Sequence, residues 1–182
     1  MRNLIQKTMA TTLSLLLTVL FAGNVFAGDK DKYTNPAAED IPKNANRIIL
    51  EQEQQPPADM YVDAMQFLRD AGYDITKAED AMETQSLNDL AENRPLTMNA
   101  EKNINKNMAV QITINVNTIP GGSQLLASAF YADSKDVSEA NWKEASWTDG
   151  KSKKAFEKAF FALRQGTYDT ITFESGVAVA SQ

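Results

Sequence analysis

Two residue types are missing from this 182-residue chain, which contains neither cysteine nor histidine. Without cysteine there is no disulfide, no thiol nucleophile and no cysteine behind a leader segment to accept a lipid. Without histidine the chain lacks the usual general acid–base residue, the central residue of Ser-His-Asp triads and the usual zinc or copper ligand. We therefore predict that the chain is not an enzyme, with no catalytic residue, metal site or cofactor.

Long apolar runs are scarce as well, and the clearest one lies near the N-terminus. Arg2 and Lys7 precede an apolar stretch at 10–22, and Val25 and Ala27 occupy the −3 and −1 positions of a cleavage site. About thirteen apolar residues are too few for a membrane span, which needs roughly twenty. The sequence therefore predicts a signal peptide at 1–27, cleaved after Ala27, with no membrane span remaining after its removal.

Positive charge is the scarcer sign in the rest of the chain. The whole sequence has 18 Lys or Arg and 24 Asp or Glu, and two of the cations lie in the predicted signal peptide. An acidic balance disfavours binding to nucleic acid or to anionic membranes. An exported domain of this size without disulfides favours the bacterial envelope. We therefore expect a bacterial protein of the periplasm, or one secreted into the medium.

The remaining chain divides into a flexible lead-in at 28–45, one domain at 46–175 and a tail at 176–182. A β-branched run at 47–51 predicts a first strand. Apolar residues with a helical period predict one amphipathic helix ending at Gly72 and another from about Ser152 to Gln165.

The strongest strand pattern is the alternation of apolar and polar residues at 108–117. A turn at 120–122 and an apolar return at 124–131 complete a predicted hairpin, whose second strand should be central or covered. Weaker patterns predict strands at 73–75, 96–98 and 168–173, a turn at 76–81 and an asparagine-rich loop at 99–107. The predicted class is α+β: an antiparallel sheet packed on one face by two amphipathic helices, in the order strand, helix, strands, helix.

Two sets of residues are candidates for binding a protein partner. The first is the polar side of the 108–117 strand, which carries Gln111, Thr113, Asn115 and Asn117. Uncharged polar side chains suit a contact surface, and a hairpin edge would also allow recognition by strand addition. The second set is Trp142 and Trp147, since exposed aromatic side chains anchor partners, although such residues more often close the end of a core under a loop.

Large apolar side chains on the two predicted helices suggest a different site, a pocket between sheet and helices for a small apolar ligand. These side chains are Met60, Met65, Phe67, Phe156, Phe160 and Phe161. The ordinary interpretation of the same residues is a packed core.

Acidic residues also gather at two places, Glu79-Asp80 with Glu83, and Asp133 with Asp136. Neither matches a calcium-binding loop, and both are interpreted as solvated turns. A pair of carboxylates acting as acid and base would be the remaining route to an enzyme, and no spacing marks such a pair.

Several segments together resemble small bacterial envelope domains of the helix-grip type. They are Ala45 to Leu50, the helix end from Leu68 to Ile75, and the strand from Val110 to Val116 with its hairpin. One group of these domains is similar to the C lipoprotein of the outer-membrane β-barrel assembly machine. The present chain differs because it lacks the lipidated cysteine, and the resemblance implies no catalytic residue.

The sequence thus favours an exported, non-catalytic binding or accessory protein of the bacterial envelope. It would hold a protein partner through its sheet face or hairpin edge. The alternative is a carrier of a small apolar ligand, and an enzyme that relies on carboxylates alone is the third possibility.

Overall fold

The computed structural model describes residues 40–78, 94–133 and 141–176. The predicted signal peptide and most of the predicted lead-in and tail lie outside these residues. The same is true of Glu79, Asp80, Glu83 and Asp136. Export and cleavage after Ala27 therefore stay predictions.

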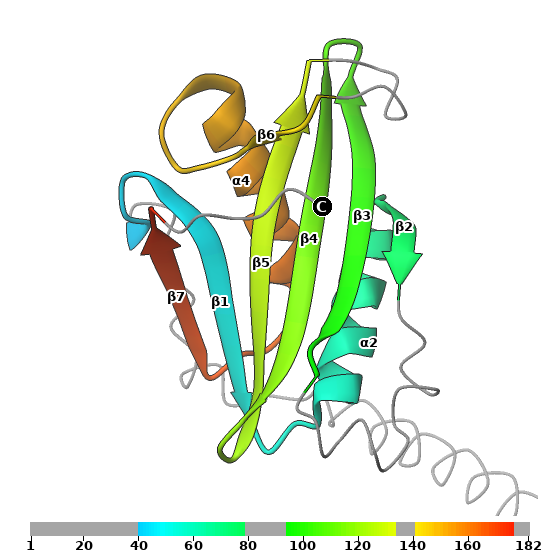
Figure 1. Cartoon of the computed structure of the whole chain (residues 1–182), viewed down its shortest axis with the longest axis vertical. Helices are drawn as coiled ribbons and strands as arrows, with labels where there is room; N and C mark the ends of the chain where they lie inside the picture. Colours follow the sequence, from blue (N-terminus) through cyan, green and yellow to red (C-terminus); the bar gives the residue numbers. More distant parts are fainter. Residues whose placement is uncertain (1–39, 79–93, 134–140, 177–182) are drawn as a thin grey trace, which may run out of the picture. The chain divides into compact units, whose positions relative to one another are not determined.

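The described residues form one antiparallel sheet with two helices (Figure 1). The strands are β1 (Ala45–Glu53), β2 (Asp74–Ala78), β3 (Leu96–Asn105), β4 (Met108–Ile119), β5 (Gly122–Ala132), β6 (Lys143–Glu144) and β7 (Thr170–Ser175). Their order across the sheet is β2-β3-β4-β5-β1-β7, and β6 pairs with the end of β5 beyond the β1 pairing.

Both described helices, α2 (Pro57–Asp70) and α4 (Gly150–Leu163), pack on the same face of the sheet (Figure 1). This arrangement confirms the predicted α+β class. Helix α2 begins at Pro57, whose fixed φ suits the first turn, and Asp59 complements the positive end of the helix dipole. Gly72, with φ +80°, lies in the turn that leads from α2 towards β2.

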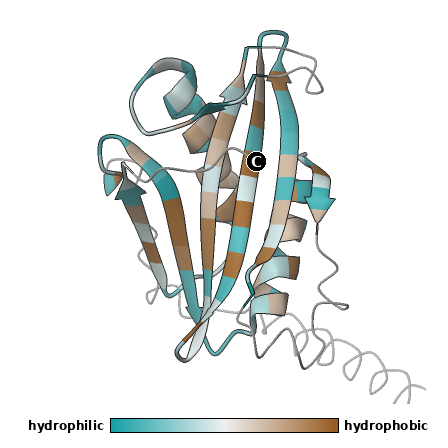
Figure 2. Cartoon of the chain, viewed as in Figure 1, coloured by the Kyte–Doolittle hydropathy of each residue, from teal (hydrophilic) through white to brown (hydrophobic). Residues whose placement is uncertain are grey.

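The core lies between the helices and the sheet. Along β4, Val110, Ile112 and Ile114 are fully buried and alternate with half-buried polar residues, an alternation visible in Figure 2. From the helices, Tyr61, Phe156 and Phe160 fill the space opposite these strands. No described helix is long and apolar enough to cross a membrane.

Two predictions between 76 and 107 are wrong. Thr76–Ala78, predicted as part of a turn, belongs to β2, and Asn99–Asn105, predicted as a loop, belongs to β3. Asparagine has a low intrinsic preference for strands, but β3 pairs with β4 along nearly all of its length and buries Met98 and Ala100. Pairing and burial therefore override the local preference.

The hairpin β4–β5 is confirmed, including the central position of its second strand. Its place in the sheet excludes the predicted hairpin edge, because β3 covers β4 and β1 covers β5. The edges of the described sheet are β2 and β7, and the latter confirms the predicted edge strand near 168–173. Ile41 and Ala45 are buried, so the core includes residues that the sequence assigns to the lead-in.

Candidate functional site

The predicted polar residues of β4 share one face, which points away from both helices. Gln111, Thr113, Asn115 and Asn117 are all half-buried and alternate with residues buried in the core. The strand register extends this face over three neighbouring strands. We call it the strand face and define it by Thr97, Asn99, Gln111, Thr113, Asn115, Asn117, Gln124, Leu126 and Ser128.

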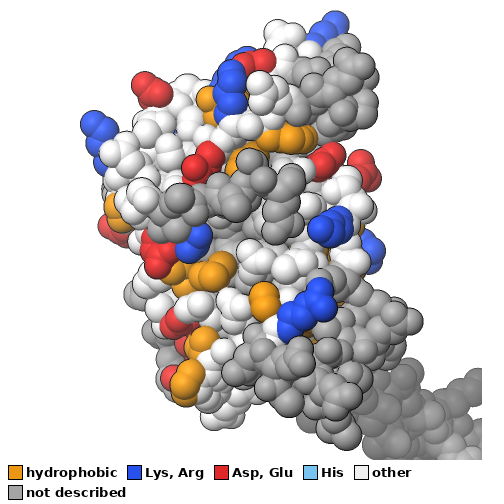
Figure 3. All heavy atoms as spheres, in the orientation of Figure 1, with side chains coloured by type: hydrophobic (Ala, Val, Ile, Leu, Met, Phe, Trp, Pro, Cys, Tyr) orange, Lys and Arg blue, Asp and Glu red, His pale blue; other side chains and the backbone are white. Residues whose placement is uncertain are grey.

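The centre of the strand face carries no charged side chain. Asn99, Thr113 and Ser128 lie directly opposite one another on three adjacent strands. Charged residues begin at its margins, where Gln111 Nε2 donates to Glu101 Oε1 at 2.9 Å. Figure 3 views the molecule from the same direction as Figure 1, and in the part of this side that the described residues form, orange side chains and white atoms lie between scattered red and blue side chains.

Two apolar residues on the same side of the sheet are well buried. Phe130, opposite Gln111, is 4% exposed, and Ile49, opposite Leu126, is 9% exposed. On this side, half-buried neutral polar groups therefore lie next to buried apolar side chains.

The two tryptophans occupy different settings. Trp147 packs against the core, with its ring centre 6.1 Å from that of Phe156 and Lys153 Nζ 4.4 Å above the ring. Its backbone also pairs with the start of β1, because Trp147 N donates to Ala45 O at 2.7 Å. Trp147 thus closes the end of the core, whereas Trp142 is half-buried just before β6.

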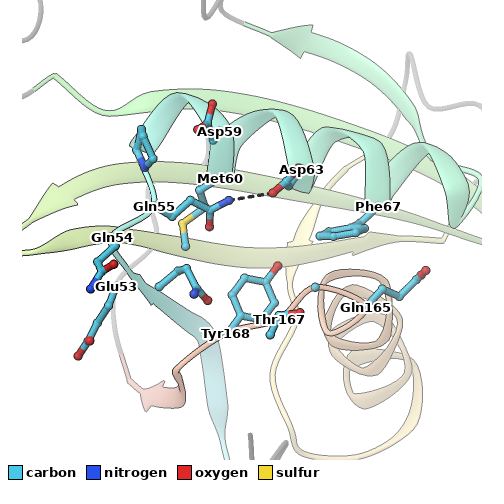
Figure 4. Close-up of a pocket in the computed structure, with 13 residues that line it drawn as sticks. Glu53, Gln54, Gln55, Asp59, Met60, Asp63, Phe67, Gln165, Thr167 and Tyr168 are labelled. Atoms are coloured by element: carbon cyan, nitrogen blue, oxygen red, sulfur yellow. Dashed lines mark hydrogen bonds between the residues drawn. The ribbon is translucent and has the colours of Figure 1, made fainter. Parts of the chain in front are cut away.

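A second feature is a cleft of about 500 Å³ on the helix side of the molecule (Figure 4). One wall is helix α2, and the others are the end of β1 with its connection to α2 and the segment that joins α4 to β7. Its lining residues are Gln52, Glu53, Gln54, Gln55, Pro56, Asp59, Met60, Asp63, Phe67, Gln165, Gly166, Thr167 and Tyr168.

Helix geometry places Asp59, Asp63 and Phe67 on this wall, because residues four apart lie one above the other. Asp63 accepts a hydrogen bond from Gln55 Nε2 at 2.8 Å. Figure 4 shows Asp63 and the Tyr168 hydroxyl pointing toward one another across the cleft. Burial raises the pKa of Tyr168, and the negative charge of Asp63 raises it further.

The opposite wall depends on a close approach at Gly166. A Cβ atom on this glycine would lie 2.7 Å from the Tyr168 hydroxyl and 2.8 Å from the ring of Phe67. The Tyr168 hydroxyl donates to Leu163 O at 3.0 Å, which fixes the ring against the end of α4. The absence of a side chain at Gly166 thus lets both aromatic rings approach the backbone at this position.

The cleft only partly matches the apolar pocket predicted from the sequence. Met60 and Phe67 line it. Phe156 and Phe160 are instead fully buried in the core, Met65 is partly buried against it, and Phe161 is 40% exposed. Sequence reasoning missed the acidic side chains of the wall, although the spacing of Asp59, Asp63 and Phe67 could have indicated them.

The acidic candidates give no metal centre in the described part of the chain, where no group of three or more carboxylates is placed to hold a metal ion. Asp133 instead receives hydrogen bonds from Lys143 and Lys151, which hold the pKa of this carboxyl below its usual range.

No protein-family model and no curated protein matches this chain.

Proposed function

We propose that this chain is an exported, non-catalytic binding or accessory protein of the bacterial envelope, which holds a protein partner through its strand face. The export step is inferred from the pattern of residues 1–27. The sequence resemblance to helix-grip envelope domains supports the same location, and the missing cysteine and histidine favour binding over catalysis.

The observation that carries the proposal is the neutral centre of the strand face. Across β3, β4 and β5 it carries hydroxyl and amide groups that are half-buried, apart from the buried Ser128, with Leu126 among them and charges only at the margin. The centre of a protein–protein interface is similarly depleted of charged residues, while its rim is polar and solvated. A partner of matching chemistry would offer hydrogen-bonding groups and small apolar side chains, not a dense charge.

The alternative, a carrier of a small apolar ligand, has less support. The space between sheet and helices is filled by side chains such as Phe156 and Phe160, which are fully buried. The cleft beside α2 is lined mainly by amides and carboxylates, which an apolar ligand would leave without partners.

Site-specific photo-crosslinking in the native envelope tests the strand face. A benzophenone amino acid placed at Thr113 or at Asn115 should give one discrete crosslinked protein. The same probe at Lys158, which is exposed on α4, should not give that product.

A charge-matched pair of variants provides the control. Thr113→Lys with Asn115→Lys places two cations in the neutral centre and should abolish the crosslinked product. Val62→Lys with Gln66→Lys adds two cations to the exposed side of α2 and should leave it unchanged. Equal crosslinking from Lys158, or a product that survives the strand-face variant, would contradict the proposal.

A further inference from the structure

A second group of buried apolar side chains lies on the side of the sheet that faces away from both helices. Its members are Ile49, Ala109, Phe130 and Ala132, with exposed fractions of 9%, 0%, 4% and 0%. None of the four belongs to the core between the sheet and the helices. The strand register places Ala109 opposite Ala132, and Ile49 opposite Leu126 of the strand face. We call these four residues the outer patch.

The described neighbours of the outer patch do not explain its burial. Side chains stand roughly perpendicular to a sheet, and Phe130 is flanked along β5 by the shorter Ser128 and Ala132. No described helix or strand lies over this side of the sheet (Figure 1). Trp142, just before β6, is near one end of the patch and Ile49 is at the other, so this single side chain does not cover both. Another part of the chain must therefore cover the outer patch.

Residues 177–182 follow β7 and start close to the outer patch. Ser175 pairs with Ala45 at the beginning of β1, the end of the sheet where β5 carries Phe130. Strand spacing and rise place both Phe130 and Ile49 within about 15 Å of Ser175. Six extended residues span about 20 Å. Gly176, with φ +73°, has a conformation that can turn the chain onto this side.

The composition of residues 177–182 suits the outer patch. The segment reads Val-Ala-Val-Ala-Ser-Gln and carries no charged side chain, whereas 23% of the whole chain is charged. In an extended segment, Val177 and Val179 point to the same side. Small apolar side chains can pack against Ile49 and Phe130 without removing a charge from water.

We propose that residues 177–182 lie across the strand side of the sheet and cover the outer patch, with Val177 and Val179 toward the sheet. The segment therefore competes with any partner for this end of the strand side. The inference goes beyond the proposed function and does not depend on it, because the cover comes from the chain itself.

Thiol labelling with iodoacetamide tests the cover. The chain has no cysteine, so Ser128→Cys introduces a single thiol of nearly the same size at a position that is 7% exposed. In the full chain, Val177→Asp with Val179→Asp places two charges against the apolar patch and should displace the segment. Labelling should then be at least about tenfold faster, because the uncovered state of a stable two-state element is at most about 10% populated.

Two controls separate loss of the cover from a general loosening of the fold. Val62→Asp with Gln66→Asp adds the same two charges to the exposed side of α2 and should leave the labelling of Ser128→Cys unchanged. Asn117→Cys places the thiol on the same side of the sheet but near the opposite end of β4, and its labelling rate should be the same with and without the valine substitutions.

A chain shortened after Gly176, shown by circular dichroism to be folded, should label at Ser128→Cys as fast as the double aspartate variant. The inference would be overturned if Ser128→Cys reacted at the original rate in both, or if Asn117→Cys accelerated equally. It would also be overturned if a folded chain that begins at residue 40 and retains residues 177–182 labelled as fast as the shortened one, since residues before 40 would then provide the cover.

Discussion

The two ends of helix α2 differ in whether a positively charged side chain lies beside them. At its C-terminal end, Lys102 Nζ donates to Ala71 O and lies 5.5 Å from the ring centre of Tyr73. A cation is favourable there because the last carbonyl groups of a helix carry partial negative charge. Along the N-terminal half of the same helix, Asp59 and Asp63 line a cleft whose described lining residues include no lysine or arginine.

Other charged contacts of the described structure resemble the C-terminal end. Asp133 binds Lys143 at 3.0 Å and also binds Lys151, and Lys143 lies 5.9 Å from the ring centre of Tyr131. In these places the chain supplies both members of each pair, so the contacts need nothing from outside. By contrast, no lysine or arginine is among the residues that line the cleft.

The largest expected effect comes from Gly122→Ala, which should displace the part of β1 that forms a wall of the cleft. A Cβ atom on Gly122 would lie 2.1 Å from the carbonyl oxygen of Gln52 and 2.9 Å from the Cα atom of Glu53. Because both neighbours are backbone, β1 must move where it forms the cleft wall. We expect the free energy of unfolding to fall by about 3 kcal/mol, the upper range for overpacking, measured by urea denaturation.

The neighbouring Gly121→Ala variant is its control. Gly121 has φ +86° and nothing within 4 Å of an added Cβ, so the substitution strains the turn but contacts nothing. Its expected cost is about 1 kcal/mol. Similar losses in the two variants would mean that the close approach of β5 to β1 does not hold the cleft wall.

Much of the fold that supports this cleft could be predicted from the sequence. The period-two alternation at 108–117 and the apolar stripes of both helices are local patterns, and the structure confirms all three elements. The second half of β3 could not be predicted, because its asparagines indicate a loop and only the pairing with β4 makes them a strand. The pairing of β7 with β1 joins distant segments and leaves no local pattern.

The two candidate sites also differ in how much of each could be predicted from the sequence. The shared face of Gln111, Thr113 and Asn115 follows from strand periodicity, so the sequence predicts it. The cleft depends on two walls that meet only in the folded chain, one on α2 and one at 165–168. The close approach permitted by Gly166 has no signature in a single sequence.

A smaller effect is expected from two buried tyrosines, Tyr168 in the lining of the cleft and Tyr73 just after α2. Tyr168 in the cleft donates to Leu163 O at 3.0 Å, whereas the buried hydroxyl of Tyr73 has no partner in the described structure. Tyr168→Phe should therefore lower the free energy of unfolding by about 1 kcal/mol. Tyr73→Phe removes an unpaired buried group and should leave stability unchanged or raise it slightly. Equal losses of stability in Tyr168→Phe and Tyr73→Phe would contradict this expected difference between the two hydroxyl groups.

The pH dependence of the free energy of unfolding, measured for the same variants at alkaline pH, tests the burial of the two tyrosines independently. Burial raises the pKa of Tyr73 and of Tyr168 above the ordinary value of 10.0. Above that pH the unfolded chain loses these protons while the folded chain retains them, so stability falls as pH rises. The slope is at most about 1.4 kcal/mol per pH unit for each tyrosine. Each Phe variant should reduce the slope between roughly pH 10 and 11, and an unchanged slope would show that neither hydroxyl is buried.

The smallest effect is expected at the C-terminal end of α2, where Lys102 lies beside the last carbonyl groups. Lys102→Met keeps the length of the side chain but removes the hydrogen bond to Ala71 O and the cation beside Tyr73. Because Lys102 is only half-buried, we expect a loss of about 0.5 kcal/mol that shrinks in high salt. Lys106→Met, at an exposed turn, is the control and should have no effect. If Lys102→Met also left stability unchanged at low salt, the cation at this end would be incidental, and the contrast with the cleft would rest on the cleft alone.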